Sequence, residues 1–326
     1  PFYGIGMLYD RSKTKVGSPG TLTFARTDPS LIRFALPLRG KVFLGWGIAP
    51  YTRADAKIEI PAQSEDDAFT DIMTSSGGVN ITSFEIAAKY KMISAGAALN
   101  YYFGSGDEEW LRDFHGIPDV NNTSDYLRKQ YGGYGATLGF LARLPRNMSV
   151  GFGYTAPTVM DVSIHIQPGN SDNAEMLLEK AKAELPATVR LGFASQISRR
   201  LSAAADMSMA EWSKAARTDK EKKMYNDVFS FGAGVRYIPS VIPTAKYLST
   251  IPLSAGFRFG SLYYKSYPKI HAIHEAALTF GAEFPFMNKS GAVITSWEIG
   301  KRGDKEKNGW DETFINVGLS LAGGIK

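Results

Sequence analysis

Residues 185–238 read LPATVRLGFASQISRRLSAAADMSMAEWSKAARTDKEKKMYNDVFSFGAGVRYI and contain three segments of strict two-residue alternation. In the first, Val189, Leu191 and Phe193 alternate with Arg190 and Gly192. The segments 201–209 and 229–237 repeat the pattern. Because successive side chains on a strand point to opposite faces, each segment predicts a strand with one apolar face and one face of small, polar and charged residues. Together they predict an antiparallel meander.

The polar face of this meander would be costly in a dry core, which leaves two structures open. One is a soluble sheet with a wet face; the other is a barrel wall with lipid outside and water inside. A soluble sheet needs a second layer, and the chain has almost no helical pattern to supply it. No run approaches the roughly 20 apolar residues of a membrane helix. A chain like this can span a membrane only as a closed barrel.

Composition excludes several classes of protein. The chain has 326 residues and no Cys, so disulfides, thiolate metal sites and Cys nucleophiles are excluded. Its 33 Gly suit strands and turns better than helices. The net charge of +5 is spread along the chain, and no basic block predicts a nucleic-acid partner. The chain begins at Pro1 without Met, which predicts a removed leader.

The alternation continues along the whole chain. Outside the meander, strands are predicted at 2–13, 31–38, from 42, 82–90, 93–103, 132–143, 149–166, 253–264, 275–286, 292–302 and 313–321. Short turns join alternate strands, and the longer connections 61–79, 104–130 and 167–185 fall on the other end, although 240–252 is long for a short turn. Short turns face the periplasm in bacterial barrels. We predict an all-β transmembrane antiparallel barrel of about fourteen strands, with short periplasmic turns and long external loops, forming a single domain over 1–326.

With the strands placed, the sequence resembles the FadL-like outer-membrane transporters of hydrophobic compounds. The resemblance rests on ELPATVRLG at 184–192, on 201–206 and on Glu211-Trp212-Ser213, which is similar to the family's "LPatv.lG" strand followed by "l..aDv....Ws". Supporting matches are GWGIAPY at 45–51 and LNYYFG at 99–104. GKRGD at 300–304 and NGWDE at 308–312 are similar to Bacteroidetes-type relatives.

The resemblance implies a bacterial outer-membrane channel for passive uptake of hydrophobic small molecules such as fatty acids. Family members capture ligand between the third and fourth external loops, pass it to a lumenal pocket and release it sideways beside a kinked third strand. The ligand-binding residues carried over to these loops are Trp110, Leu111, Phe114, Met176, Leu177 and Leu178. The last three belong to 175–185, read as one helical face. Alternatively, both loops pack into a lid.

The resemblance also assigns the kink and lateral opening of the third strand to Gly45, Gly47 and Pro50. Pro50 cannot donate to a strand ladder, so a bend is expected there, or the proline simply marks the strand's outer edge. Family members begin with a hatch that carries an Asn-Pro-Ala motif. No such motif precedes the first predicted strand, so we expect the hatch to lie upstream of Pro1 or to be absent.

Several charged residues are predicted to face the lumen. They are Arg33, Glu85, Lys89, Arg143, Arg190, Asp206, Arg236, Arg258, Glu275, Glu283, Glu298 and Arg302. Mixed signs inside a barrel are expected to pair across strands. Arg190, Arg236 or Arg258 are alternatively suited to a ligand carboxylate, since a guanidinium matches its two oxygens.

No enzyme signature is recognisable. The sequence has no nucleophile elbow, phosphate loop or metal-ligand spacing, and His271 and His274 fit a surface pair. We predict no catalytic residue, metal or cofactor. The expected partners are outer-membrane lipid, lipopolysaccharide and a hydrophobic ligand. Two alternatives to the uptake channel stay open: a non-transporting barrel serving as a binding platform for other envelope proteins, like the shuttle of type IX secretion, or a general porin.

Overall fold

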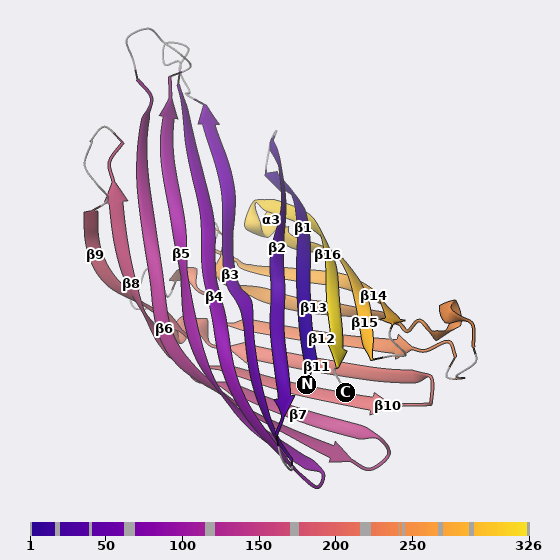
Figure 1. The fold of residues 1–326 in the computed structure, drawn as a ribbon. Helices are drawn as coiled ribbons and strands as arrows, with labels where there is room; N and C mark the ends of the chain where they lie inside the picture. Colours follow the sequence, from indigo (N-terminus) through magenta and orange to yellow (C-terminus); the bar gives the residue numbers. More distant parts are fainter. Residues whose placement is uncertain are drawn as a thin grey trace.

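The structure, a computed structural model, describes residues 2–16, 20–38, 41–61, 69–114, 121–169, 176–215, 223–240, 242, 245–266, 270–286 and 290–324, with backbone only at 15–16, 20–24 and 61. Nearly all of these residues form antiparallel strands (Figure 1). The strands are β1 (Phe2–Val16), β2 (Gly20–Pro37), β3 (Val42–Pro61), β4 (Thr70–Tyr90), β5 (Ile93–Asp113), β6 (Thr123–Leu144), β7 (Met148–Thr155), β8 (Thr158–Gln167), β9 (Met176–Leu185), β10 (Thr188–Gln196), β11 (Leu201–Ala210), β12 (Val228–Tyr237), β13 (Leu253–Lys265), β14 (Ala272–Phe286), β15 (Gly291–Asp304) and β16 (Trp310–Gly324). The helices α1 (Trp212–Ala215), η1 (Tyr247–Thr250) and α3 (Lys305–Asn308) have four residues each. In the part of the chain described, none of the helices is long and apolar enough to cross a membrane.

The sheet closes on itself. The first strand pairs with the last, from Phe2 opposite Gly324 to Val16 opposite Trp310, and every other wall strand pairs with its neighbours. β7 and β8 lie end to end along β6, separated at Pro157, and β9 and β10 are separated at Pro186. Proline lacks the N–H that a ladder needs, which accounts for both breaks. The sixteen segments therefore form fourteen wall strands, and the predicted fold class is confirmed.

The two faces of the wall differ in composition as the alternation requires. On β10, Val189, Leu191 and Phe193 are exposed on the outer face, while Arg190 and Gly192 face the lumen. The outer faces of β5, β11 and β14–β16 follow the same rule. Since lipid contacts only apolar side chains favourably, the outer face forms an apolar belt around a polar interior. The architecture is that of a transmembrane β-barrel of the bacterial outer membrane.

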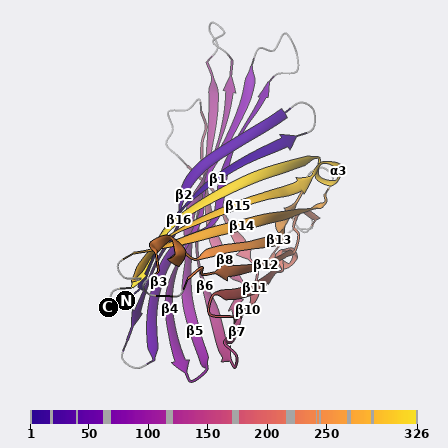
Figure 2. The same cartoon turned by 90° about the vertical axis from the view of Figure 1, so that its right-hand side faces the viewer.

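The orientation follows from the connections. Short turns such as 91–92, 145–147 and 197–200 lie at the end that carries both termini, and this is the periplasmic end. Figure 2 shows the termini opposite α3. The turns at 39–40 and 287–289 lie outside the described residues. A longer periplasmic connection, 240–252, contains η1.

Two predicted external loops are largely strands instead. β5 continues to Asp113 and β6 begins at Thr123, while β8 continues to Gln167 and β9 begins at Met176. The helical reading of 175–185 was wrong, because cross-strand pairing with β8 satisfies the backbone of β9 in an extended form. Together β3, β4, β5, β6, β8 and β9 form an external sheet, in which β3 to β6 rise above the rest of the wall (Figure 1).

The aromatic run at 101–103 is divided between two faces. Tyr101 stacks on Phe103 at 5.7 Å and packs against Tyr134 at 4.8 Å on the outer face. Tyr102, between them in the sequence, is 2% exposed and faces the lumen. Strict alternation along β5 forces this division. Tyr101, Phe103 and Tyr134 form an outer girdle of the kind found where barrels meet the membrane interface.

β2 and β3 separate halfway along their length. They pair only from Pro37 opposite Phe43 to Ile32 opposite Ile48, and above this point each strand continues without the other. On its other side β3 keeps pairing with β4, but its register shifts between Pro50 and Thr52. This register shift lies at the residue where a bend was expected: Pro50 cannot donate to β2, and the following Tyr51 bulges. The wall is thus split between β2 and β3 above Ile48.

The outer turn between β15 and β16 has its own polar framework. Asp304 accepts hydrogen bonds from the backbone N–H groups of Glu306 and Lys307, both at 2.9 Å, and caps α3. The buried Asn308 donates to Ser266 Oγ at 3.1 Å, which ties this turn to the connection between β13 and β14. Gly309 has a φ of +82°, a conformation that favours glycine. The residues of the 300–312 motif thus fix an external turn.

The membrane assignment is tested at Leu191. We expect Leu191→Arg to block outer-membrane assembly, because an Arg within the lipid-facing belt costs about 2–4 kcal/mol near the bilayer midplane. The matched control is Gly192→Arg on the next residue of β10, where an added side chain meets open lumen. Heat-modifiable migration of the outer-membrane fraction reports assembly. Normal insertion of Leu191→Arg would refute the barrel orientation.

Candidate functional site

The lumen contains a partly enclosed cavity of about 260 Å³. Six wall strands contribute side chains or backbone to it. The lining includes Tyr51, Ile81, Ser83, Glu85, Asn100, Tyr102, Thr137, Thr155, Leu185, Thr188 and Arg190. The bulge in β3 places Tyr51 at the edge of the split between β2 and β3, where its ring meets that of Tyr102 edge-on at 5.2 Å. The cavity therefore lies directly inside the split wall.

One side of the cavity carries a continuous chain of polar groups across five strands. Ser83 Oγ donates to Asn100 Oδ1 at 2.8 Å, and Asn100 Nδ2 donates to Thr137 Oγ1 at 2.8 Å. Thr137 and Thr155 hydroxyls lie 3.1 Å apart, and Arg190 Nη1 donates to Thr155 Oγ1 at 3.1 Å. Asn100 is only 2% exposed, so these partners are required to satisfy its amide. The chain ends at the guanidinium of Arg190.

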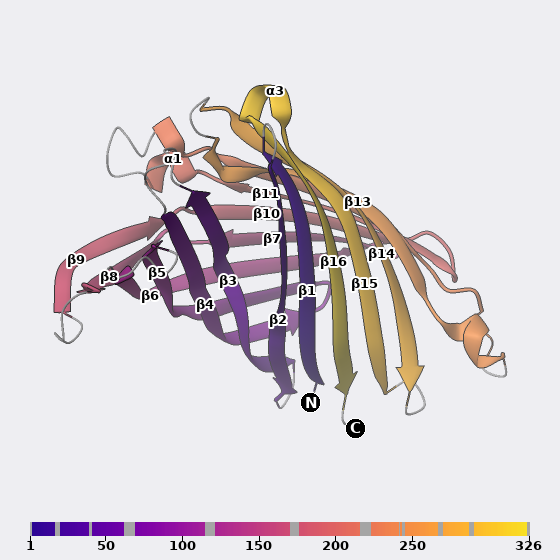
Figure 3. The ribbon, with the colours of Figure 1, turned by 90° about the horizontal axis from the view of Figure 1, so that it is seen from above.

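An aromatic bridge crosses the outer end of the lumen. Trp212 of α1 packs against the buried cluster formed by Val79, Tyr102, Met160 and Leu185 on one wall. On the opposite wall its ring stacks on Tyr263 of β13 at 4.5 Å. Tyr225 adds edge contacts to both rings, at 6.0 Å from Trp212 and 6.3 Å from Tyr263. Seen from above, α1 lies at the same external end as α3 (Figure 3).

Above this bridge, the lumen-side face of the external sheet carries apolar residues together with an ion pair, Lys129 to Glu108 at 2.6 Å. Trp110 and Gly106 share a face of β5, and Gly106 lies beside the ring of Tyr131, which packs on the buried cluster. Cross-strand pairs place two rows on this face: Ile58, Met73 and Trp110, then Leu127, Ile166 and Met176. Met160 and Val162 continue the surface toward the cavity and are buried. Apolar residues therefore extend from the sheet's tip to the aromatic bridge, interrupted by the pair of Glu108 and Lys129.

The predicted capture residues lie on this single sheet and not on two facing loops. Trp110 and Leu111 belong to β5 and point to opposite faces, and Phe114 follows β5, with its ring 6.0 Å from that of Phe69. Met176, Leu177 and Leu178 begin β9. β6 and β8 lie between these two groups in the sheet.

The tip of the sheet is also polar at one point. Arg112 donates to both carboxylate oxygens of Asp71, at 2.7 and 2.8 Å, and lies 4.2 Å from the Phe69 ring centroid. This hydrogen bonding holds the pKa of the exposed Asp71 below its ordinary value. The pair joins the ends of β4 and β5.

Most lumenal charges are paired across strands. Arg33 of β2 binds Glu85 of β4 at 2.6 Å, passing over β3 at Gly45 and Gly47. A Cβ at Gly45 would stand 3.0 Å from Glu85, and one at Gly47 would stand 3.3 Å from Arg33. These two glycines leave room for the ion pair, whereas the change of register lies further along, at Pro50.

A larger network occupies the opposite wall. Arg258 binds Glu275 and Glu298, and Arg302 binds Glu275 at 2.9 Å and Glu312 at 3.5 Å. Both guanidinium groups lie within 6 Å of the Phe314 ring centroid. Separately, Arg236 of β12 binds Glu283 of β14 at 2.7 Å. Arg236 and Arg258 therefore have carboxylate partners within the protein.

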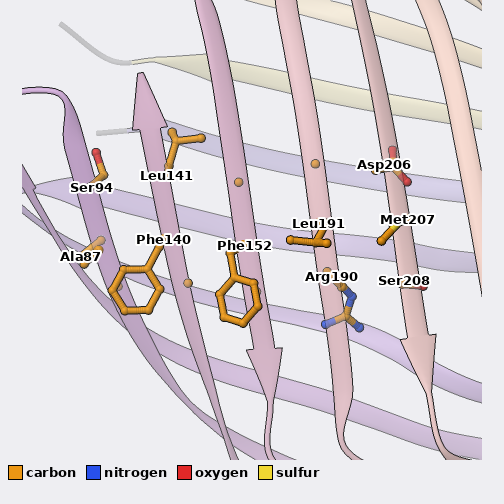
Figure 4. Close-up of a pocket in the computed structure, with 16 residues that line it drawn as sticks. Ala87, Ser94, Phe140, Leu141, Phe152, Arg190, Leu191, Asp206, Met207 and Ser208 are labelled. Carbon is orange, nitrogen blue, oxygen red and sulfur yellow. The ribbon is translucent and has the colours of Figure 1, made fainter. Parts of the chain in front are cut away.

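Arg190 and Asp206 differ from these residues. Arg190 donates to a hydroxyl, and Asp206 has neither a hydrogen bond nor an ion pair among the described residues. Both line a second depression of about 580 Å³ on the lumenal side of β10 and β11 (Figure 4). Glycines 151, 153 and 192 line the same space, which is open because they carry no side chains. Of the three arginines considered for a carboxylate, Arg190 is the one without an acid partner here.

Neither of the predicted surface histidines approaches a metal site. The ring of His274 stacks on Phe259 at 5.9 Å, and the backbone oxygen of His271 accepts from Ser266. Over the described ranges, no three His, Cys, Asp or Glu residues are grouped as metal ligands.

Sequence reasoning missed the cavity's principal residues. Tyr51 follows Pro50. A proline within a strand indicates a bulge, and this signal could have been used to predict that the Tyr51 ring points inward. Trp212 stood in the Glu211-Trp212-Ser213 motif without an assigned role. Asn100 and Tyr102 occupy lumenal positions of a predicted strand, but alternation alone does not distinguish a cavity lining from any other inward side chain.

Comparison with known proteins bears on both family and fold. The model of the family described as BamG matches residues 2–323, and no curated protein matches significantly. Similar solved structures include the Ralstonia pickettii toluene transporter TbuX, with 15% identity, a TM-score of 0.64, and coverage of 100% of this chain and 89% of that chain. The P. putida toluene transporter TodX has 15% identity, a TM-score of 0.63 and coverage of 99% and 90%. A Pseudomonas aeruginosa FadL homologue has 14% identity, a TM-score of 0.65 and coverage of 99% and 90%.

At these identities the structural likeness establishes a common fold. The FadL-like barrel inferred from short sequence motifs is confirmed at that level, while the matching family model carries a different description. Because this match extends over nearly the whole chain, the protein belongs to the BamG family, and its barrel has the FadL-like fold.

Proposed function

We propose that this barrel is an outer-membrane channel for passive uptake of hydrophobic small molecules. The observation that carries the proposal is the set of apolar residues, interrupted by one ion pair, that leads from the external sheet to the aromatic bridge and the cavity behind it. The free energy of a hydrophobic ligand falls when it covers an apolar surface, so such a surface is a favourable path out of water. The solved transporters of toluene with the same fold support this class of ligand.

The split between β2 and β3 is proposed as the lateral exit. It lies beside Tyr51, so a ligand leaving the cavity reaches the wall without crossing the charged periplasmic half of the lumen. Gly45 and Gly47 support this opening indirectly, since they let Arg33 and Glu85 pair across β3 just below it. Pro50 ends the pairing that would otherwise seal the strands.

Within this class, we propose an amphipathic ligand with a carboxylate, such as a fatty acid. Arg190 faces the cavity and offers hydrogen-bond donors that no carboxylate of the protein occupies. A ligand carboxylate at Arg190 would leave its apolar part against Tyr51, Tyr102 and Leu185. Charge-assisted hydrogen bonds to guanidinium are among the stronger polar contacts available in such a site.

Deletion of the protein tests the uptake proposal. We expect deletion cells to take up radiolabelled hydrophobic compounds more slowly than wild-type cells, with recovery when the gene is restored. Uptake of a hydrophilic sugar serves as the control for envelope integrity. Equal rates of hydrophobic uptake in deletion and wild-type cells would count decisively against a channel.

Arg190→Gln tests the carboxylate site. Loss of a hydrogen bond to a charged group is worth about 1.5–3 kcal/mol, so we expect roughly 10- to 100-fold weaker binding of laurate by calorimetry. Toluene binding should be unchanged. Arg143→Gln, which removes another lumenal cation, is the matched control. Equal laurate affinity in wild type and Arg190→Gln would remove Arg190 from the site while leaving the channel proposal intact.

The aromatic bridge favours one alternative and disfavours another. A general porin needs an open aqueous lumen, whereas Trp212 and Tyr263 meet across this one. A closed lumen is compatible with a barrel that serves as a binding platform for envelope proteins. Stable co-purification with such proteins, together with normal hydrophobic uptake after deletion, would support the platform.

Trp212→Ala measures how far the bridge closes the lumen. We expect the wild-type barrel to show little conductance in planar bilayers and Trp212→Ala to raise it several-fold, because the substitution removes the contact that joins opposite walls. Trp110→Ala, on the external sheet, should leave conductance unchanged. A wild-type conductance of hundreds of picosiemens would instead support a porin.

A further inference from the structure

The outer face of three adjacent strands changes from apolar to polar near one level, and the two flanking strands carry cations there. On β1, Tyr9 is followed on the same face by Arg11 and Lys13; on β15, Ile299 is followed by Lys301. β16 lies between them, with Ile315 opposite both Arg11 and Ile299. Thr313 lies opposite both Lys13 and Lys301. The apolar belt therefore ends at Ile315 and Ile299 on β16 and β15, and one same-face position lower, at Tyr9, on β1.

The orientation of these side chains follows from exposure and alternation. Tyr9, Arg11 and Lys13 are exposed, while Asp10 and Ser12 between them are partly buried. On β15, Arg302 points into the lumen and binds Glu275, so its neighbour Lys301 points outward. Arg11, Lys13 and Lys301 consequently face the surroundings of the barrel at its external end.

None of these three cations has a carboxylate partner among the described residues. The nearest acid on the outer face of β16, Asp311, lies 3.8 Å from Lys305 of α3. Other cations of the external wall are paired with acids: Arg128 binds Asp107 at 2.9 Å, and Lys57 binds Glu59 at 2.8 Å. The sector formed by β1, β16 and β15 is thus a local excess of positive charge, to which exposed Lys307 adds.

The level of this charge identifies its partner. Immediately beyond the apolar belt at the external end lie the headgroups of the outer leaflet, which in this membrane belong to lipopolysaccharide. Its lipid A carries phosphate groups on a sugar core directly above its acyl chains. Guanidinium and ammonium groups are the side chains that bind phosphate, and acyl chains would cover Tyr9, Ile315 and Ile299 below.

We propose that Arg11, Lys13 and Lys301, here called the cationic strip, bind the phosphate groups of lipid A in the outer leaflet. Lys13 and Lys301 are separated by two inter-strand spacings, about 10 Å, so they can engage separate phosphates of one lipid. The hydroxyl of Thr313 lies between them as a neutral donor. This site lies on the outside of the barrel and is independent of the transport proposal.

Binding of lipid A to the purified full chain tests the strip. The probe is bisphosphorylated lipid A in detergent micelles, with thermophoresis as the readout. We expect the triple variant Arg11→Gln, Lys13→Gln and Lys301→Gln to bind at least about 10-fold more weakly than wild type. The matched control removes three exposed cations from the periplasmic turns: Lys91→Gln, Arg146→Gln and Arg199→Gln. Its affinity should stay within about twofold of wild type.

Two outcomes would overturn the proposal. Unchanged affinity in the strip variant would show that these residues do not bind the lipid, and an equal loss in both triple variants would reduce the effect to overall charge. Wild-type protein provides a test that needs no substitution: it should bind dephosphorylated lipid A at least about 10-fold more weakly. Equal affinity for the two lipids would overturn the proposal even if the strip variant failed to fold.

Discussion

The closed ladder of backbone hydrogen bonds is the constraint on which the rest of the structure depends. In hydrocarbon, an unpaired backbone N–H or C=O group finds no water to hydrogen-bond with, so a spanning sheet must leave no free edge. Pairing of β1 with β16 over their full lengths meets this condition. The irregular features lie near the external end, where β2 separates from β3 beyond Ile48. Ile48 pairs with Thr82, and Thr82 pairs with Tyr101 of the outer girdle, so all three lie at one level of the wall. The split therefore begins near the membrane interface, where water can satisfy the freed groups.

Closure also fixes what the interior can contain. A fourteen-strand ring encloses more space than alternating small side chains fill, so the lumen stays hollow wherever glycine, alanine and serine line it. An ion pair can join two strands over the strand between them only where that middle strand has small side chains. Gly45 and Gly47 show the requirement directly, since a Cβ at either position would crowd the pair formed by Arg33 and Glu85. Small residues thus determine which strands can be joined by ion pairs on the lumenal face.

The wall could be predicted from the sequence because lipid imposes a period of two on every strand. That period alone is enough to place Leu191 outside and Arg190 inside. It did not reveal where strands end, because strands that continue into water need no apolar face; β9 therefore resembled an amphipathic helix. The cavity could not be predicted from the sequence either. Tyr102, Trp212 and Tyr263 come from segments far apart in the chain, and only the closed ring brings them together.

The two halves of the barrel consequently differ in their physical character. From β12 to β16, Arg258, Arg302 and their glutamates bind across four strands and pack on Phe314, which is 2% exposed. Breaking any such pair would leave a charge in a poorly hydrated setting, so this half resists deformation. From β2 to β10, neutral hydrogen bonds, aromatic contacts and a strand bulge surround the cavity, and each costs less to rearrange. A ligand that enters the lumen can therefore displace the cavity wall and the edge at Tyr51 while the opposite wall keeps its shape.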